Sequence, residues 1–282
     1  EIDPPAHLDW QPWAEGARAL LAAGADAISL AENPLASIRM ENFFLAAWLR
    51  RETRGQVVCH VTCRDRNSLG LQSSLLAAHA AGVGAVLAVT GDPAQRGGHQ
   101  RVMSVYEQTS VGLVRLIATL NAGRTSTGRD LRGRTDFSIG VAFNSAAANP
   151  AAETEKLRRK RDEGAVFVMT QPVFDRDQAH RVLEQTRLEG VRVFPGFLPP
   201  VTRKLAHYLH HEIPGIRLAG PLLQMLDRYE QPEDQQRAAL EWTREKIAAL
   251  APELEGVYLI TPGARWQALL PLLAAAAERP LC

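Results

Sequence analysis

Residues 85–94 read Ala-Val-Leu-Ala-Val-Thr-Gly-Asp-Pro-Ala, an apolar run that stops at a glycine, a carboxylate and a proline. A short continuous apolar run between turn residues is typical of a strand that is buried on both faces, as in a parallel sheet covered by helices. Active sites of open α/β sheets and of (β/α)8 barrels lie at the carboxyl ends of their strands, so Asp92 is the first candidate functional residue. The alternative is a structural turn aspartate, because Gly-Asp-Pro is ordinary turn chemistry.

One local pattern recurs along the chain: a helix-like stretch, a glycine, and then a short apolar run. It precedes the runs at 27–30, 85–89, 165–169, 191–194 and 257–260, and further strands are expected at 56–61 and 137–143 and, cut short by two prolines, at 1–3. Amphipathic helices are expected at about 12–23, 40–51, 67–81, 104–121, 150–163, 175–189, 201–211 with 219–228, 232–250 and 264–278. Eight βα alternations predict a (β/α)8 TIM barrel, as a single domain over residues 1–282.

The composition excludes several classes of protein. A net charge of +1 over 282 residues gives no general field that would attract nucleic acid or an anionic membrane. No apolar run approaches the ~18 residues of a membrane span. The three cysteines, Cys59, Cys63 and Cys282, lack metal-ligand spacing, so neither a disulfide framework nor a metal site is expected, and the compartment is expected to be reducing.

Polar residues stand at or just beyond most of the expected strand ends, where a barrel would bring them to one pocket. They are Glu1, Asp3, Ser29, Asn33, His60, Thr62, Thr90, Asp92, Asn144, Thr170, Gln171, Thr261 and Arg265, with the aromatic Phe143 among them. Burial of Glu1 in a crevice would suit a general acid, although an exposed glutamate is the alternative. His60 and Thr62 share one face of their strand, where a binding role for the histidine is favoured over proton transfer.

The expected helix at 150–163 ends in a basic run at residues 158–161. Such a run is typical of a solvated helix end that complements the helix dipole. It could instead clamp a pyrophosphate, since guanidinium and ammonium groups donate charge-assisted hydrogen bonds to phosphate oxygens. The chain contains neither a Gly-x-Gly-x-x-Gly motif nor a Walker loop, and the spacing leaves both interpretations open.

Six stretches in order resemble one family, the flavin-dependent methylenetetrahydrofolate reductases. They are residues 1–5 (Glu-Ile-Asp-Pro-Pro), 60–65 (His-Val-Thr-Cys-Arg-Asp), 89–92 (Val-Thr-Gly-Asp), 159–165 with its Arg-Lys pair, 169–172 (Met-Thr-Gln-Pro) and 195–199 (Pro-Gly-Phe-Leu-Pro). Residues 62–67 and 259–262 look most like the reductase half of bifunctional bacterial chains that carry a homocysteine S-methyltransferase domain upstream. A chain that starts at Glu1 and not at Met agrees with that expectation.

The resemblance implies a cytoplasmic barrel of one-carbon metabolism and methionine biosynthesis. It would bind FAD and use NADH or NADPH to reduce 5,10-methylenetetrahydrofolate to 5-methyltetrahydrofolate in two half-reactions. Matched by position, Glu1 is the general acid that protonates N10, and Asp92 is the carboxylate beside flavin and pterin. Gln171 reads the folate, and Arg265 faces its tail. The implied FAD contacts are Ser29, Asn33, His60, Thr62, Val89, Thr90, Gly91, Asp92, Phe143, Arg159 and Lys160.

Some positions depart from the family pattern. Thr90 replaces an arginine, Phe143 replaces a tyrosine, and the loop 144–149 looks shorter than in stand-alone bacterial enzymes. Two other functions stay open: a folate-binding TIM-barrel methyltransferase, and a flavin-binding subunit that needs a partner for electrons. The sequence does not decide between the two nucleotides, and it is compatible with a homo-oligomer.

Overall fold

The computed structural model describes residues 1–99, 101–213, 215–263 and 265–277. The chain divides into two compact units, and each is described by itself. The first comprises Glu1–Leu21, Asp26–Ala142 and Lys156–Phe167, and the second comprises Ala22–Ala25, Phe143–Glu155 and Val168–Cys282. In the described residues, seven strands follow one another in chain order, β1 to β7, through one sheet.

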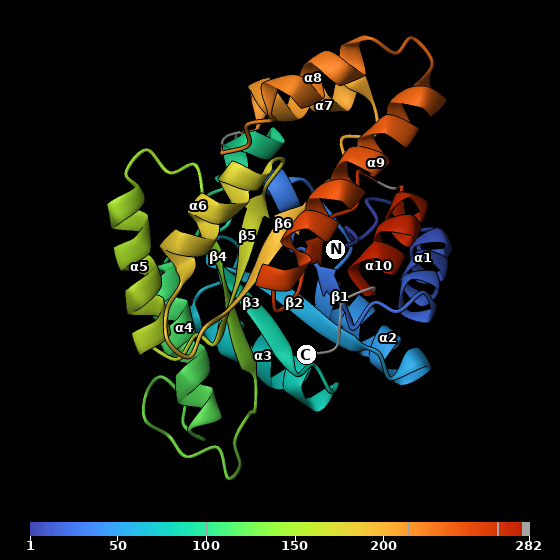
Figure 1. The fold of residues 1–282 in the computed structure, drawn as a ribbon. Helices are drawn as coiled ribbons and strands as arrows, with labels where there is room; N and C mark the ends of the chain where they lie inside the picture. The colour runs from blue at the N-terminus through green and yellow to red at the C-terminus, as the bar shows by residue number, and fades with distance from the viewer. Residues whose placement is uncertain (100, 214, 264, 278–282) are drawn as a thin grey trace. The chain divides into compact units, whose positions relative to one another are not determined.

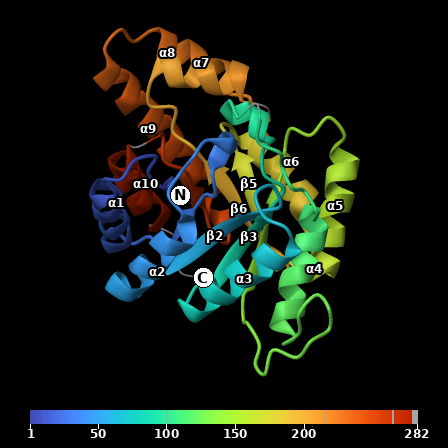
Figure 2. The same cartoon turned by 180° about the vertical axis from the view of Figure 1, so that it is seen from behind.

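The strands of the first unit bring polar residues to neighbouring carboxyl ends. They are β1 (Ala27–Leu30), β2 (Gln56–Thr62), β3 (Ala85–Val89) and β4 (Ser138–Phe143), and each pairs in parallel with the next. The register places Leu30 opposite Cys59, and Thr62 opposite Val89. The loops that follow β1, β2 and β3 therefore leave the sheet from neighbouring strands, of which β2 and β3 are seen next to each other in Figure 2.

Helices with buried leucine stripes cover these strands. They are α1 (Gln11–Ala22), α2 (Asn42–Thr53), α3 (Ser68–Ala80), α4 (Ser110–Asn121) and the end of α5 (Pro150–Asp162), with the 3-10 turns η1 (Pro34–Ala36) and η2 (Ala94–Gly97). Leu45, Leu49, Leu71, Leu75 and Leu113 are fully buried. Side-chain caps fix the starts of α3 and α4, where Asn67 accepts from Gly70 N and Thr109 from Gly112 N.

The second unit contains the remaining strands and five longer helices. Its elements are β5 (Phe167–Pro172), α6 (Arg176–Thr186), β6 (Arg192–Phe197), α7 (Arg203–Glu212), α8 (Gly220–Asp227), α9 (Pro232–Leu250), η3 (Ala251–Glu253), β7 (Tyr258–Leu259), η4 (Trp266–Leu269) and α10 (Leu270–Ala277). β6 and β7 pair in parallel. Phe174, Leu209, Leu222, Leu226 and Ala239 belong to the core over which α7, α8 and α9 lie together (Figure 1).

The structure confirms an α/β fold with seven parallel strands, but the expected strand at residues 1–3 is wrong. Residues 1–5 have no strand assignment, and Ile2 N donates to Ser29 O of β1 at 3.2 Å. Pro4 and Pro5 have no N–H group with which to continue a ladder, so the segment cannot extend as a strand. An eighth strand is thus not formed in the described part of the chain.

Two predicted boundaries also shift. β5 runs to Pro172, so Thr170 and Gln171 lie within the strand and not beyond it. Helix α4 begins at Ser110 and not at residue 104, because Val105 N donates to Arg64 O (2.7 Å) and the backbone there pairs with the loop after β2. The ends of the expected helix at 264–278, like Cys282, lie outside the described residues. Within the described chain, no helix has the length and apolar character of a membrane span.

Candidate active site

Three predicted site residues of the first unit form one hydrogen-bonded cluster. Ser29 lies on β1 and His60 on β2, and Ser29 Oγ is 2.9 Å from His60 Nε2. The same nitrogen is 3.3 Å from Glu1 Oε2, and the Glu1 and His60 side chains are each 13% exposed. The bond from Ile2 N to Ser29 O fixes the segment that carries Glu1 against β1. The structure therefore brings Glu1, Ser29 and His60 together, as the strand-end pattern predicts.

The imidazole of this cluster is neutral near pH 7. Burial lowers the pKa of His60 to about 4. Burial and the charge of Glu1 raise the pKa of Asp3 to about 6. Nε2 of a neutral imidazole accepts one hydrogen bond through its single lone pair or, in the other tautomer, donates one, so it can pair with the Ser29 hydroxyl or with the Glu1 carboxylate. The cluster therefore holds the Glu1 carboxyl next to a group that can exchange a proton with it.

The pKa of His60 predicts how stability depends on pH. The folded value of about 4 lies below the ordinary 6.5, so the unfolded chain binds more protons between these values. The stabilisation is present above pH 6.5 and is lost as pH falls toward 4. Asp3 acts in the opposite sense, because its raised pKa makes its contribution fade as pH rises through about 6.

We expect replacement of His60 by Gln to remove the His60 part of this dependence. Between pH 7 and pH 5, the parent protein should lose roughly 1–3 kcal/mol more unfolding free energy than the variant. Urea unfolding of both proteins at the two pH values measures the difference, and Asp3, which both proteins carry, acts in the same direction in each. Equal losses in the two proteins would contradict a buried neutral imidazole.

Asp92 lies in the turn that follows β3, and its carboxylate is held on both oxygens. Oδ2 accepts from Leu35 N at 3.2 Å, and Oδ1 lies 3.1 Å from Arg96 Nη1. Its side chain is 35% exposed, which leaves part of the carboxylate accessible. Gly91 has φ +85°, and a Cβ there would lie 3.0 Å from Thr62 Cβ, so only glycine permits this close turn. Val89 is half-buried and Thr90 is exposed.

Arg64 is a site residue that the sequence patterns do not single out, although it lies within the stretch at residues 60–65. This arginine follows β2, is 2% exposed, and donates to Asn33 O and to Asp92 O, each at 3.2 Å. Glu32, also buried, accepts from Thr62 N at 2.6 Å and pairs with Arg66. A charged residue beside a strand end is usually solvated, so only the pairing of Arg64 with the adjacent Asp65 could have signalled its burial.

Six buried side-chain polar atoms have no hydrogen-bond partner within the described chain, and two of them belong to predicted site residues. One is Thr62 Oγ1 at the carboxyl end of β2, in the first unit. The other is Gln171 Oε1 on β5, in the second unit, where the amide packs against Gly215. Buried polar atoms in native proteins normally have partners. Trp13, Asn42, Arg50 and Arg66 carry the other four such atoms, so the missing partner marks a ligand contact only where the position is itself a predicted site residue, as Thr62 and Gln171 are.

The basic pair of α5 is divided by burial. Arg159 is exposed, whereas Lys160 is 3% exposed and its Nζ donates to Ala142 O of β4 at 3.0 Å. Adjacent helical positions differ by about 100° around the axis, so the two side chains cannot share one face. Lys160 thus has a structural role in this unit, and Arg159 is the side chain free to meet solvent or a ligand.

This division gives opposite expectations for two single replacements. Lys160→Met should destabilise the FAD-free protein by about 1–3 kcal/mol, because the carbonyl of Ala142 loses a charged donor. Arg159→Ala should change that stability by less than about 0.5 kcal/mol, as for most exposed positions. Denaturant unfolding without FAD tests both variants, and FAD retention is then measured on each. Equal destabilisation by the two would contradict the observed difference in burial.

The predicted site residues of the second unit differ in accessibility. Phe143 is 1% exposed at the end of β4. Gln171 is half-buried, and Arg265 is exposed just before η4. In the first unit, Asn33 adopts the left-handed conformation (φ +42°), and its side chain accepts from Arg39 N at 2.8 Å. Among the predicted site residues of the second unit, Arg265 is therefore the one with an exposed positive charge.

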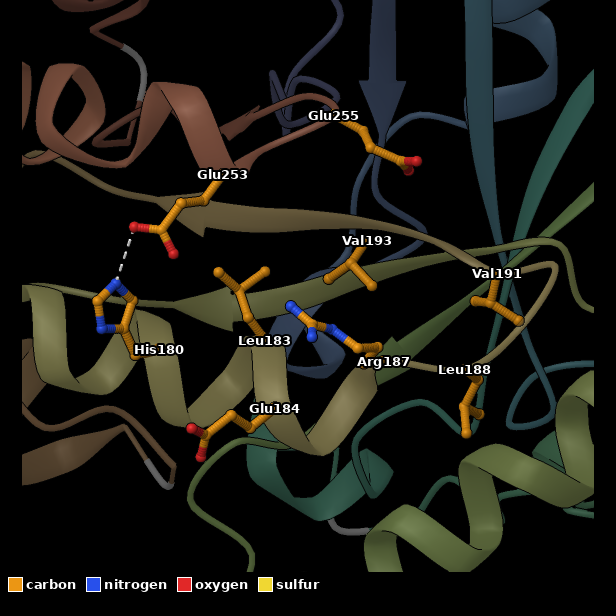
Figure 3. Close-up of a pocket in the computed structure, with 9 residues that line it drawn as sticks. All are labelled: His180, Leu183, Glu184, Arg187, Leu188, Val191, Val193, Glu253 and Glu255. Carbon is orange, nitrogen blue, oxygen red and sulfur yellow. Dashed lines mark hydrogen bonds and ion pairs between the residues drawn. The ribbon is translucent and has the colours of Figure 1, made fainter.

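A cavity of about 410 Å³ in the second unit lies away from strand carboxyl ends. It is lined by His180, Leu183, Glu184, Arg187, Leu188, Val191, Val193, Glu253 and Glu255 (Figure 3). Val191 and Val193 stand at the amino end of β6. His180 Nε2 is 3.2 Å from Glu253 Oε1, and both side chains are more than one-third exposed. Paired, solvated groups of this kind give no reason to place catalysis here.

Two comparisons by sequence point to the same family. A family model described as methylenetetrahydrofolate reductase matches residues 12–261. Methylenetetrahydrofolate reductase 1 of Schizosaccharomyces pombe is 29% identical over 146 residues, which make up 50% of this chain and 22% of that protein. The chain therefore matches about a fifth of the length of this relative.

Two solved structures share the fold. An uncharacterized protein from Clostridium thermocellum that binds two copies of 5-methyl-5,6,7,8-tetrahydrofolic acid superposes with a TM-score of 0.66 at 12% identity, over 98% of this chain and 92% of that chain. EDTA monooxygenase from a Chelativorans species gives a TM-score of 0.58 at 11% identity, over 96% and 88%. At such identities the likeness concerns the fold alone.

Proposed function

The chain belongs to the methylenetetrahydrofolate reductase family, and on that premise we propose that it reduces 5,10-methylenetetrahydrofolate to 5-methyltetrahydrofolate. FAD is the proposed cofactor and NADH or NADPH the electron donor, in two half-reactions in the cytoplasm. The observation that carries the proposal is the placement of Glu1 against a neutral His60 imidazole, in the same unit as the half-buried Asp92. A folate ligand of the Clostridium thermocellum protein supports the substrate class.

The chemistry needs two different carboxyl groups. FAD, once reduced by NADH or NADPH, would supply the hydride, which only an electrophilic carbon can accept. Opening of the folate imidazolidine ring makes such a carbon, and it requires a proton at N10. Glu1, held by His60 Nε2, donates that proton. Asp92 contributes a fixed negative charge that stabilises the resulting iminium cation.

The other predicted residues fit this function as proposed contacts. Thr62 Oγ1 and Gln171 Oε1 are two of the six buried atoms without a partner in the described chain; the first suits a hydrogen bond to FAD and the second one to the pterin. Arg265 is proposed to meet the folate tail. The remaining proposed FAD contacts are Ser29, Asn33, His60, Val89, Thr90, Gly91, Asp92, Phe143, Arg159 and Lys160. Ser29, Thr62, Phe143 and Lys160 are all buried, so direct contact with FAD would require each to become uncovered.

A sequence of three measurements tests the proposal. Purified protein should bind FAD with flavin absorbance, and NADH or NADPH should bleach it anaerobically. Added methylenetetrahydrofolate should then restore the absorbance and yield 5-methyltetrahydrofolate. Protein that takes up no FAD would refute the proposal. Folate binding without flavin would instead favour a methyltransferase, and flavin that no nicotinamide nucleotide reduces would favour a subunit that needs an electron-donating partner.

A further inference from the structure

We propose that Arg64 is a positioning residue that sets the orientation of the Asp92 carboxylate; its catalytic consequence rests on the proposed function. Arg64 is 2% exposed, in the turn directly after β2. A buried guanidinium must find partners for its donors, since an unpaired buried charge is very costly. The partners of Arg64 come from the loops that follow β1, β2 and β3, and all lie in the first unit.

The Arg64 guanidinium joins two loops that are distant in sequence. Its Nη1 donates to Asn33 O after β1 and to Asp92 O after β3, each at 3.2 Å. The same two loops also meet through the Asp92 side chain, because Leu35 N of the loop after β1 donates to Asp92 Oδ2. Arg64 thus holds the backbone of Asp92 and also the loop whose amide orients the Asp92 side chain.

Asp65 fixes the direction in which the guanidinium points. Arg64 Nε donates to Asp65 Oδ1 at 2.7 Å, and Nη2 donates to Oδ2 at 2.6 Å. Burial acts to raise the pKa of Asp65, but the hydrogen bonds and charge of Arg64 outweigh it and hold that pKa below its ordinary value. Such a bidentate contact restricts rotation of the planar group, which leaves Nη1 aimed at the two carbonyls.

The loop after β1 would not keep its shape without support. Asn33, Leu35 and Ala36 have φ of +42°, +53° and +56°, in the left-handed region that side chains disfavour. Strained conformations of this kind persist only where surrounding contacts hold them. The bonds from Arg64 to Asn33 O and from Asn33 Nδ2 to Asp65 Oδ2 (3.4 Å) are such contacts. Loss of the guanidinium should let the loop relax and turn the Leu35 amide away from Asp92.

The test uses Arg64→Lys, Asp92→Asn, the double variant and a matched control. Lysine keeps the positive charge but cannot form the bidentate contact with Asp65. Asp65→Asn weakens the same bidentate contact while Arg64 stays in place. The control is Arg115→Lys. Arg115 makes a like bidentate contact with Glu163, at 2.9 and 2.5 Å, on the surface of the same unit.

Single-turnover folate reduction is the first readout. We expect Arg64→Lys to slow it about 10- to 100-fold, the scale of a misplaced catalytic group. Flavin reduction by nicotinamide nucleotide should change less than about twofold. In the Asp92→Asn background, the lysine replacement should cost less than about twofold, since residues that act through one another are non-additive. Equal slowing in both backgrounds would overturn the proposal.

Amide hydrogen exchange at Leu35 is the second readout, and it does not depend on activity. Exchange should quicken about tenfold in Arg64→Lys and in Asp65→Asn, as for a local opening, and should stay unchanged in Arg115→Lys. Unchanged amide exchange at Leu35 in both Arg64→Lys and Asp65→Asn would refute the role of Arg64. A parent protein that does not reduce folate would refute the proposed function alone, and the exchange measurement would still decide whether Arg64 holds the loop.

Discussion

Replacement of Glu1 by Gln is expected to collapse folate reduction while flavin reduction by NADH or NADPH continues. Glutamine keeps the size of the side chain and can still contact His60 Nε2, 3.3 Å from the present carboxylate, but it has no proton to give. A general acid typically contributes about 10²- to 10⁴-fold to a rate, and the loss should fall in that range. Rapid mixing of prereduced protein with methylenetetrahydrofolate measures the affected step directly.

Asp3→Asn is the matched control for this replacement. Asp3 is a second half-buried carboxyl two positions away, and its raised pKa of about 6 reflects burial and the charge of Glu1. The general acid should remain in place in this variant, so the folate step should keep most of its rate. A Glu1→Gln protein that reduces folate at the parental rate would remove Glu1 from the mechanism. Equal losses of the folate-reduction rate in Glu1→Gln and Asp3→Asn would mean that the structure of residues 1–3, and not the acid function of Glu1, controls the rate.

The elements predicted well from sequence are those formed by an unbroken run of buried apolar residues. The apolar run at 85–89 is β3 to the residue, and the turn that follows it places Asp92 where the pattern expects it. The expected strand at 1–3 fails for a local reason, because two prolines follow it. The start of β5 is misplaced, since residues 165–169 are apolar but the strand begins at Phe167. An apolar run therefore locates a buried segment better than it locates the residue at which the hydrogen bonding of the strand begins.

The candidate site divides in the same way. Ser29 and His60 could be grouped from sequence because neighbouring parallel strands bring their carboxyl ends together, whereas Glu1 reaches them from a segment that forms no strand. Arg64 could not be found so, because its burial depends on two loops that meet only in the folded chain. From sequence, Arg159 and Lys160 are expected to bind the same phosphate because they are adjacent. On a helix, adjacent side chains point in different directions, and here one is exposed and the other is buried.

Replacement of Asp92 by Asn is expected to slow the folate half-reaction while flavin reduction continues or quickens. Asparagine can still accept a hydrogen bond from Leu35 N, so the loop contact at 3.2 Å need not be lost, but the fixed negative charge is removed. The iminium cation then loses its electrostatic partner, and the folate step should slow by about 10²-fold or more. The midpoint potential of bound FAD should rise, because a nearby anion disfavours added negative charge. Flavin reduction by NADH or NADPH should therefore continue or quicken.

The control for Asp92→Asn is Arg96→Gln, which removes the cation 3.1 Å from Asp92 Oδ1 and leaves the carboxylate charged. If the ion pair were what matters, both variants would slow the folate step alike. If the charge of Asp92 matters, only Asp92→Asn slows it, and the potential moves upward in that variant alone. Stopped-flow measurement of each half-reaction, with a redox titration of bound FAD, separates these cases. A parental folate rate in Asp92→Asn would show that the carboxylate serves the turn after β3 and not the cation.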